Sequence, residues 1–190
     1  MGYPIVMNFK NQRILIVGGG KVAYRKAKKL RDYSVNLSVY SPEFISDFEG
    51  LTIKKIVGKL TVNAFDLLES YDFIFAATDD EGLNKKILEY CQDKRILVSS
   101  ATDQLSDFIV PASFKIGDLL ISISTAGKAP FLSRQIKEDL KSKYTEEYLD
   151  LIFKVRECLK KTNNKDELYQ LLTLPEEELR DYYEKNYCRG

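Results

Sequence analysis

The stretch that decides the fold is ILIVGGGKVAYRKAKKL, residues 14–30, which runs from an apolar tetrapeptide through three glycines into a helical repeat. The apolar run RILIV at 13–17 predicts a short buried strand that stops at the first glycine. Ala23, Ala27 and Leu30 lie at i, i+4 and i+7, which predicts a helix that turns this face inward and its lysines outward. The sequence therefore predicts a strand, a tight glycine turn and a helix in immediate succession.

The turn itself matches the pattern G-x-G-x-x-A, with the residues Gly18, Gly19, Gly20, Lys21, Val22 and Ala23. In this pattern the first glycine permits the bend, the next admits a pyrophosphate close to the backbone, and the alanine keeps the helix near the strand. The first N–H groups of the helix then hold the anion. We predict dinucleotide binding here; a glycine turn kept only for packing remains the alternative.

The next hundred residues repeat the alternation of strand and helix. We expect further strands at 35–40, 51–57, 73–78 and 95–100, and a helix from Leu83 to Cys91 that packs Leu83, Ile87 and Cys91. Strands that alternate with helices at this spacing indicate βαβ units and a parallel sheet covered on both faces. The predicted class is α/β with a Rossmann-type sheet over residues 1–106.

The alternation of predicted strands and helices stops after residue 106. DFIVPASF and DLLISISTA indicate two strands with no helix between them, and Pro130 starts a helix. From Thr145 onward the chain is predicted to be helical, with one apolar stripe at Tyr148, Ile152, Val155 and Leu159, another at Leu168, Leu171 and Leu172, a loop at Asn163-Asn164 and a last helix after Pro175. We therefore expect a small α+β segment at 107–144 and a helical part at 145–190.

Composition restricts the chemistry. The 190 residues are 44% hydrophobic and 30% charged, with no apolar run long enough to suggest a membrane span. A net charge of +1 gives no general attraction for nucleic acid. The three cysteines, Cys91, Cys158 and Cys188, form neither a disulfide framework nor a metal motif and suit the cytoplasm. Because the chain has no histidine, serine-hydrolase triads and the usual zinc sites are excluded, no metal site is expected, and a general base must be a carboxylate, Tyr, Lys, Cys or water.

The sequence only partly indicates which dinucleotide binds. A NAD-binding unit usually carries Asp or Glu at the end of its second strand for the ribose hydroxyls. Tyr40 and Ser41 hold that position here, and the first acid is Glu43, beyond Pro42. No arginine stands there for a 2′-phosphate. We expect NAD, with contacts from Ser41, Pro42 and Glu43, and leave NADP open.

Several motifs together resemble one family. YPIVMNFKNQRILIVGGGKVAYRKAKKL, SPE, AATDDEGLN, DFIVPA and STAGKAPFLSRQI, in this order and over roughly residues 3–142, are similar to the precorrin-2 dehydrogenase / sirohydrochlorin ferrochelatase family, which also forms the N-terminal part of siroheme synthase. The resemblance implies a Rossmann domain, a small dimerisation segment of hairpin and helix, a helical C-terminal part and a homodimer. The apolar strand LLISIS independently favours a partner, because a lone domain would leave it as an exposed edge.

The resemblance also assigns site residues. It implies that Asp103, in SSATDQLSDF after the fifth strand, is the catalytic carboxylate, and that Thr78, Asp79 and Asn84 approach the nicotinamide half. The spacing before FIVP is shorter than usual in the family, so Thr102 or Asp107 could fill the catalytic position, and Asp103 could be a turn residue. Asp79 and Asp80 could equally cap the next helix.

The implied substrate is a polycarboxylate tetrapyrrole, which calls for hydrogen-bond donors. The candidate donors are Ser124, Thr125, Gly127 and Lys128 in STAGK, with Ser133 and Arg134 on the following helix. The leading hypothesis is NAD-dependent oxidation of precorrin-2 to sirohydrochlorin. A second hypothesis adds insertion of Fe2+ in the same cleft. A third is a non-catalytic partner protein that binds a dinucleotide and a tetrapyrrole.

Overall fold

The computed structural model describes residues 2–33, 36–101, 105–160 and 165–187. The chain divides into two compact units, Met1–Val110 and Pro111–Gly190. The first unit thus continues four residues past the boundary expected at residue 106, and the second contains both the hairpin region and the C-terminal helices. Within the described residues, no helix is both long enough and apolar enough to cross a membrane.

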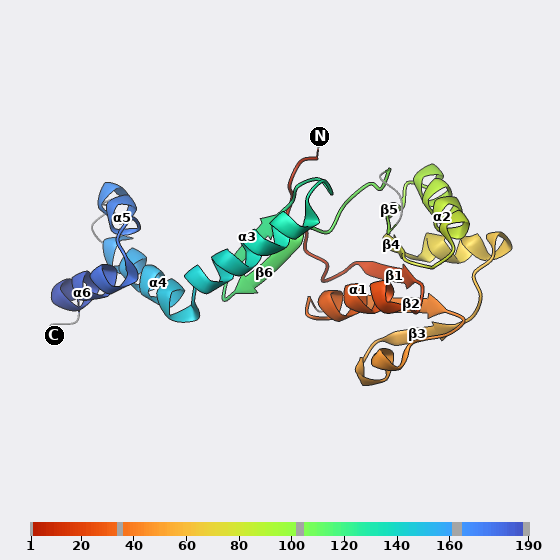
Figure 1. Ribbon diagram of the computed structural model, residues 1–190, viewed down its shortest axis with the longest axis horizontal. Helices are drawn as coiled ribbons and strands as arrows, with labels where there is room; N and C mark the ends of the chain where they lie inside the picture. Colours follow the sequence, from red (N-terminus) through yellow and green to blue (C-terminus); the bar gives the residue numbers. More distant parts are fainter. Residues whose placement is uncertain (1, 34–35, 102–104, 161–164, 188–190) are drawn as a thin grey trace. The chain divides into compact units, whose positions relative to one another are not determined.

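The first unit is built on a five-stranded parallel sheet in the order β3-β2-β1-β4-β5, shown in Figure 1. The strands are β1 (Arg13–Val17), β2 (Asn36–Ser41), β3 (Lys54–Val57), β4 (Phe73–Ala76) and β5 (Leu97–Ser100). The order reverses at β1, which pairs with β2 on one side and with β4 on the other. This is the Rossmann-type arrangement, and it confirms the predicted α/β class.

Successive side chains of β1 enter two separate cores, because strand residues alternate between the faces of a sheet. Ile14 and Ile16 join the first core, under α1 (Lys21–Arg31) and the 3-10 helix η1 (Ser46–Gly50). Leu15 and Val17 join the second core, under the 3-10 helix η2 (Val62–Ser70) and α2 (Glu81–Asp93). All four side chains are at most 2% exposed, so β1 is the centre of the unit.

Several predicted bounds were wrong in detail. Strand β3 begins at Lys54 rather than at residue 51, and neither 3-10 helix was expected. Helix α2 ends at Asp93 rather than Cys91 because its C-terminus closes with a Schellman motif: Ile96 N–H donates to Cys91 O at 2.8 Å and Arg95 N–H to Gln92 O at 3.2 Å. Arg95 takes the left-handed position at φ 58°, where glycine is usual, so no glycine marks the end of this helix in the sequence.

The lysines of α1 do not all point outward as expected. Ala23, Ala27 and Leu30 are buried as predicted, but Lys26 and Lys29 are half-buried. A helix face that covers a sheet is wide enough for the stems of flanking lysines to pack along its border.

The second unit begins with an antiparallel hairpin of β6 (Ala112–Ile116) and β7 (Leu119–Ile123), in which Phe114 faces Ile121. The first of these strands starts five residues later than the segment DFIVPASF suggested. Helix α3 (Pro130–Lys143) packs on both strands and starts at Pro130 as predicted. The hairpin has one covered face, and its outward positions Leu120 and Ser122 are exposed.

The C-terminal part consists of α4 (Glu146–Lys160), α5 (Lys165–Leu171) and α6 (Glu176–Tyr187). Its core contains Leu151, Val155, Leu159, Leu171 and Leu179, with the predicted stripe residues Tyr148 and Ile152 packed against it. Leu172 was expected in the second stripe, but it is exposed because the helix ends at Leu171. Side-chain burial of Leu168 and the predicted loop at Asn163-Asn164 lie outside the described residues.

Candidate functional site

The carboxyl ends of β1, β2 and β4 meet at one edge of the sheet, beside the point where the strand order reverses. In open α/β sheets, ligands bind in the crevice outside these ends. Three hydrogen bonds fix the edge: Gly18 N–H to Tyr40 O at 2.8 Å, Ala77 N–H to Val17 O at 2.8 Å, and Ile45 N–H to Gly19 O at 3.0 Å. Backbone hydrogen bonds therefore join the glycine turn and the end of β1 to the segments that follow β2 and β4.

Each of the three glycines has a different reason to lack a side chain. Gly18 has φ +125°, and a Cβ there would lie 2.3 Å from Ala77 O. A Cβ on Gly19 would lie 1.9 Å from Glu43 O. A Cβ on Gly20 would meet no atom within 4 Å, and the backbone there, at φ −87° and ψ −172°, is open to any residue. The protein's own packing thus requires the first two glycines, whereas Gly20 borders open space.

That open space lies before the N-terminus of α1, whose N-cap is Gly20. Among the described residues no side chain caps this terminus, and its first turn contains no acid. Lys21 and Val22 are exposed there, and Ala23 is buried against the sheet. Helix N–H groups and the helix dipole both favour an anion at such a place. The cradle fits the pyrophosphate of a dinucleotide, because a Cβ at Gly20 would occupy the space through which the phosphates approach.

The segment after β2 contributes mainly through its backbone. Ser41 is 5% exposed, and its Oγ lies close to the position that a Gly19 Cβ would take. Pro42 and Glu43 are exposed, so the first acid beyond β2 is open to solvent. The close approach of Glu43 O to Gly19 explains why this loop and the glycine turn form one rigid wall.

The segment after β4 is held by a fully buried asparagine. Asn84 Nδ2 donates to Thr78 O at 2.9 Å, and Asn84 Oδ1 accepts from Thr78 N–H at 3.1 Å and from the Thr78 hydroxyl at 2.7 Å. The Asn84 amide is thus engaged with Thr78, which makes Asn84 a residue that positions this wall. Asp80 caps α2 by accepting from Leu83 N–H at 2.9 Å, and Asp79 is exposed beside it.

The catalytic candidates Asp103 and Thr102 lie outside the described residues. Their flanks are anchored at the same edge of the sheet: Ala101 N–H donates to Ala76 O at 2.9 Å, and Ser100 N–H donates to Ser106 Oγ at 2.8 Å. The chain therefore leaves and returns beside the end of β5.

The alternative candidate Asp107 has a structural role in this arrangement. Its Oδ2 accepts from Val98 N–H at 3.0 Å, and its Oδ1 accepts from Gln92 Nε2 at 3.2 Å. Its own N–H donates to Val98 O at 3.0 Å. One carboxylate oxygen thus bonds to β5 and the other to α2, a role that sequence spacing alone did not indicate.

The candidate donors of the second unit form a tight turn between β7 and α3. Ala126 at φ 51° and Gly127 at φ 79° both take left-handed conformations. Ala129 N–H donates to Thr125 Oγ1 at 3.0 Å, and Thr125 Oγ1 lies 3.3 Å from the buried Ser133 Oγ. Thr125 and Ser133 therefore hold the turn together, and they leave other groups for a ligand.

The exposed groups of this turn are Ser124, Gly127, Lys128 and Arg134. Ser124 Oγ accepts from Ala126 N–H at 3.1 Å, which still leaves its hydroxyl hydrogen to donate. The Arg134 guanidinium lies 5.9 Å from the centroid of the exposed Phe131 ring. The turn thus presents two cations and a hydroxyl next to the N-terminus of a helix.

Sequence reasoning missed the half-buried Lys26, whose Nζ lies 4.9 Å from the centroid of the Phe75 ring. Burial, followed by the charges of Arg25 and Lys29, lowers the pKa of Lys26. Lys26 lies three residues after Ala23, on the border of the inward-facing stripe of α1, and this position could have indicated its partial burial.

Comparison with known proteins gives a consistent result. A family model described as "Putative NAD(P)-binding" matches residues 5–112. A precorrin-2 dehydrogenase of Priestia megaterium is 29% identical over 178 residues, which cover 90% of this chain and 87% of that protein. A solved structure described as SirC, precorrin-2 dehydrogenase, is similar with a TM-score of 0.69 and 27% identity, covering 97% of this chain and 100% of that one.

Longer proteins also match. A siroheme synthase of Acinetobacter baylyi is 35% identical over 144 residues, which cover 74% of this chain but 31% of that protein. The chain therefore spans about a third of the length of this siroheme synthase.

Proposed function

The chain belongs to the precorrin-2 dehydrogenase / sirohydrochlorin ferrochelatase family, and we propose that it oxidises precorrin-2 to sirohydrochlorin in siroheme biosynthesis, with NAD as its cofactor. The observation that carries the proposal is the similarity to a precorrin-2 dehydrogenase over nearly the whole length of both chains. The open cradle at Gly20 supports it, because hydride removal of this kind needs a nicotinamide cofactor.

Bound NAD+ would supply the acceptor for the hydride that leaves precorrin-2. The residues Gly18–Ala23 would hold its pyrophosphate at the N-terminus of α1, and Ser41, Pro42 and Glu43 would border the ribose. Thr78, kept in place by Asn84, would form the wall on the nicotinamide side together with Asp79.

Loss of a hydride must be matched by loss of a proton to a base. We assign this role to Asp103, because the chain has no histidine and the oxygens of Asp107 accept hydrogen bonds from Val98 N–H of β5 and from Gln92 Nε2 of α2. The flanks of Asp103 leave the sheet at the carboxyl edge, where the other walls of the crevice lie. A carboxylate there can accept the proton and return it to water.

Ser124, Thr125, Gly127, Lys128 and Arg134 are proposed to receive carboxylate arms of the tetrapyrrole. The exposed cations would pair with carboxylates, and the strained turn would hold the donors in a fixed arrangement. Thr125 would act mainly by keeping the turn closed.

A homodimer in the cytoplasm is part of the proposal. The hairpin of β6 and β7 is a separate two-stranded sheet that α3 covers on one face, with Leu120 exposed on the other face. A two-stranded sheet leaves both of its edges available for pairing, so a second copy is the expected partner. Light scattering coupled to gel filtration tests this: a monomer at working concentration would contradict it.

Ferrochelation is a second candidate function, favoured by the 35% identity to a siroheme synthase. Fe2+ would then be a second substrate, inserted as the pyrrole N–H protons leave. The same carboxylate could accept those protons.

An anaerobic assay tests these proposals. Purified protein is mixed with precorrin-2 and NAD+, NADH absorbance is followed, and Fe2+ is then added while the siroheme spectrum is monitored. NADH without siroheme indicates a dehydrogenase alone, and both signals together indicate both activities. The absence of both signals favours the non-catalytic partner protein. Asp103→Asn should abolish NADH formation and keep NADH affinity, whereas the control Asp93→Asn, at an exposed position ending α2, should remain active.

A further inference from the structure

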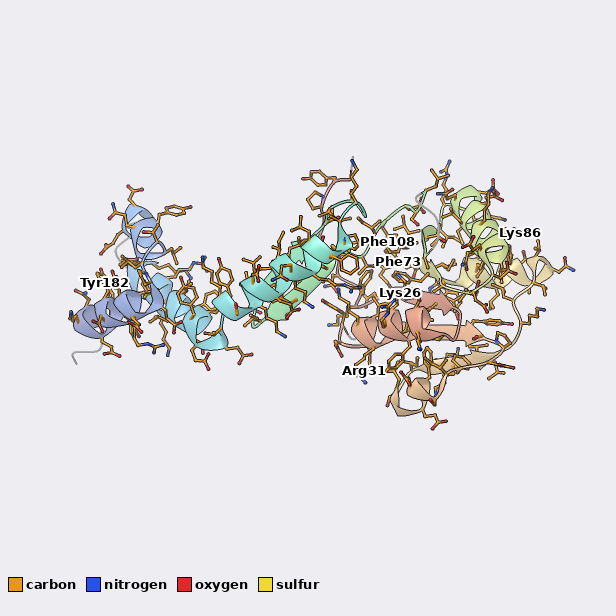
Figure 2. The ribbon with its side chains drawn as sticks, in the orientation of Figure 1. Lys26, Arg31, Phe73, Lys86, Phe108 and Tyr182 are labelled. Atoms are coloured by element: carbon orange, nitrogen blue, oxygen red, sulfur yellow. The ribbon has the colours of Figure 1, made fainter. Side chains whose placement is uncertain are left out.

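Lys26 holds an unusual position for a lysine of this protein. It lies on α1 with its stem half-buried, and its ammonium stands over the Phe75 ring of β4, 4.9 Å from the ring centroid. Figure 2 labels Lys26 on α1, together with Phe73 and Phe108. The Phe108 ring contacts both of the β4 rings, at 5.3 Å from Phe75 and 5.7 Å from Phe73. Lys26 is therefore a cation that α1 directs onto this aromatic wall.

The charges around Lys26 are all of its own sign. Burial lowers the pKa of the Lys26 ammonium most, and the charges of Arg25 and Lys29 lower it further. Within the residues that the structure describes, no carboxylate forms an ion pair with Lys26, although Lys94 pairs with Glu69 at 2.8 Å. Partly burying an ammonium without a counter-ion is unfavourable, and the cation–π contact offsets only part of that cost. An anion would relieve it.

Residues of the aromatic wall are adjacent in sequence to residues that bond to the flanks of the candidate catalytic segment. Phe75 precedes Ala76, whose carbonyl accepts from Ala101 N–H, and Phe108 follows Ser106, whose hydroxyl accepts from Ser100 N–H. The chain between Ala101 and Ser106 contains Asp103. Lys26 thus contacts the residue before Ala76, and Ala76 is bonded to the start of the segment that contains the candidate base.

We propose that the Lys26 ammonium binds a carboxylate arm of the tetrapyrrole against the wall of Phe75 and Phe108. The inference rests on the proposed function, since it takes the substrate class from it. A carboxylate there would gain from the low dielectric beside the aromatic rings and from the two neighbouring cations. The lysine would orient the macrocycle toward the segment that carries Asp103.

The test uses uroporphyrin I, a stable porphyrin with the same class of carboxylate arms, and measures its affinity by fluorescence quenching. Lys26→Met should weaken binding at least tenfold, and Lys26→Arg should retain part of the affinity because it keeps the charge. The control is Lys28→Met, an exposed lysine on the opposite side of α1, which should change binding by less than about twofold.

A second readout separates this role from a purely structural one. Because Lys26→Met removes an unpaired charge and its repulsion with Arg25 and Lys29, it should raise the melting temperature by about 2–4 °C. A lysine kept for packing would give a lower melting temperature and unchanged uroporphyrin affinity. NADH affinity should not change in either variant, which confirms an intact Rossmann unit.

Wild-type affinity in Lys26→Met, or no binding of uroporphyrin by the wild-type protein, would overturn the inference. If the methionine variant does not fold, Lys26→Gln is measured in its place with the same criterion. Failure of the proposed function is distinguishable, because it is read from the absence of NADH formation by the wild-type protein with precorrin-2.

Discussion

Replacing Gly20 by alanine separates nucleotide binding from stability. The backbone at Gly20 suits any residue, and the new Cβ meets no atom within 4 Å. Alanine is a poorer N-cap than glycine, but it also restricts the unfolded chain. These effects oppose each other, so the free energy of unfolding should change by less than about 1 kcal/mol.

The same methyl group should greatly weaken NADH binding. It would stand in the open space before the first N–H groups of α1, where a pyrophosphate must approach. Loss of two hydrogen bonds to a charged group, at about 1.5–3 kcal/mol each, corresponds to a Kd at least about a hundredfold higher. Titration calorimetry with NADH measures this, and thermal unfolding shows that the variant is folded.

Gly19→Ala is the matched control. A Cβ there would lie 1.9 Å from Glu43 O, so the loop after β2 must move and the bond from Ile45 N–H to Gly19 O at 3.0 Å is strained. We expect a loss of about 2–4 kcal/mol of stability, as for overpacking of a rigid site. A folded Gly20→Ala variant that binds NADH as tightly as the wild-type protein would refute the reasoning.

Three further changes test the framework around the crevice. Asn84→Ala leaves the N–H and C=O of Thr78 without their partners, and we expect about 2–4 kcal/mol lower stability in chemical denaturation. Arg95→Gly should be neutral or stabilise the protein by up to about 1 kcal/mol because it relieves a left-handed backbone, whereas Arg95→Val should lower the melting temperature. Hydrogen bonds from Arg13 lower the pKa of Asp72 below 3.8. The stabilisation from this pair is therefore present above pH 3.8 and is lost as the pH falls through the lowered pKa. Asp72→Asn should remove part of the acid dependence of the free energy of unfolding.

The parts of the fold that the sequence predicted are those with short-range causes. The strand of residues 13–17, the glycine turn and the inward face of α1 all follow from adjacent residues, because periodicity and glycine content are local properties. The start of α3 follows in the same way from Pro130.

What could not be predicted depends on contacts between distant segments. The end of α2 was placed early because Arg95 takes a position that glycine usually marks. The different needs for Gly18, Gly19 and Gly20 depend on Ala77 and Glu43, which lie far along the chain. A sequence motif identifies the turn, but only the packed neighbours show which glycine faces a ligand.

Asp107 illustrates how such contacts decide between two candidate bases. If its role is to close the edge of β5, Asp107→Asn should keep an acceptor for Val98 N–H and retain activity, while Asp107→Ala should lose about 1–2 kcal/mol of stability. If Asp107 were instead the proton acceptor, the asparagine variant would be folded but would form NADH at least about a hundredfold more slowly. Steady-state rates with precorrin-2, together with denaturation of both variants, distinguish these outcomes. Val98 N–H of β5 and Gln92 Nε2 of α2 both donate to this carboxylate, so Asp107 ties the strand to the helix, which favours the structural role.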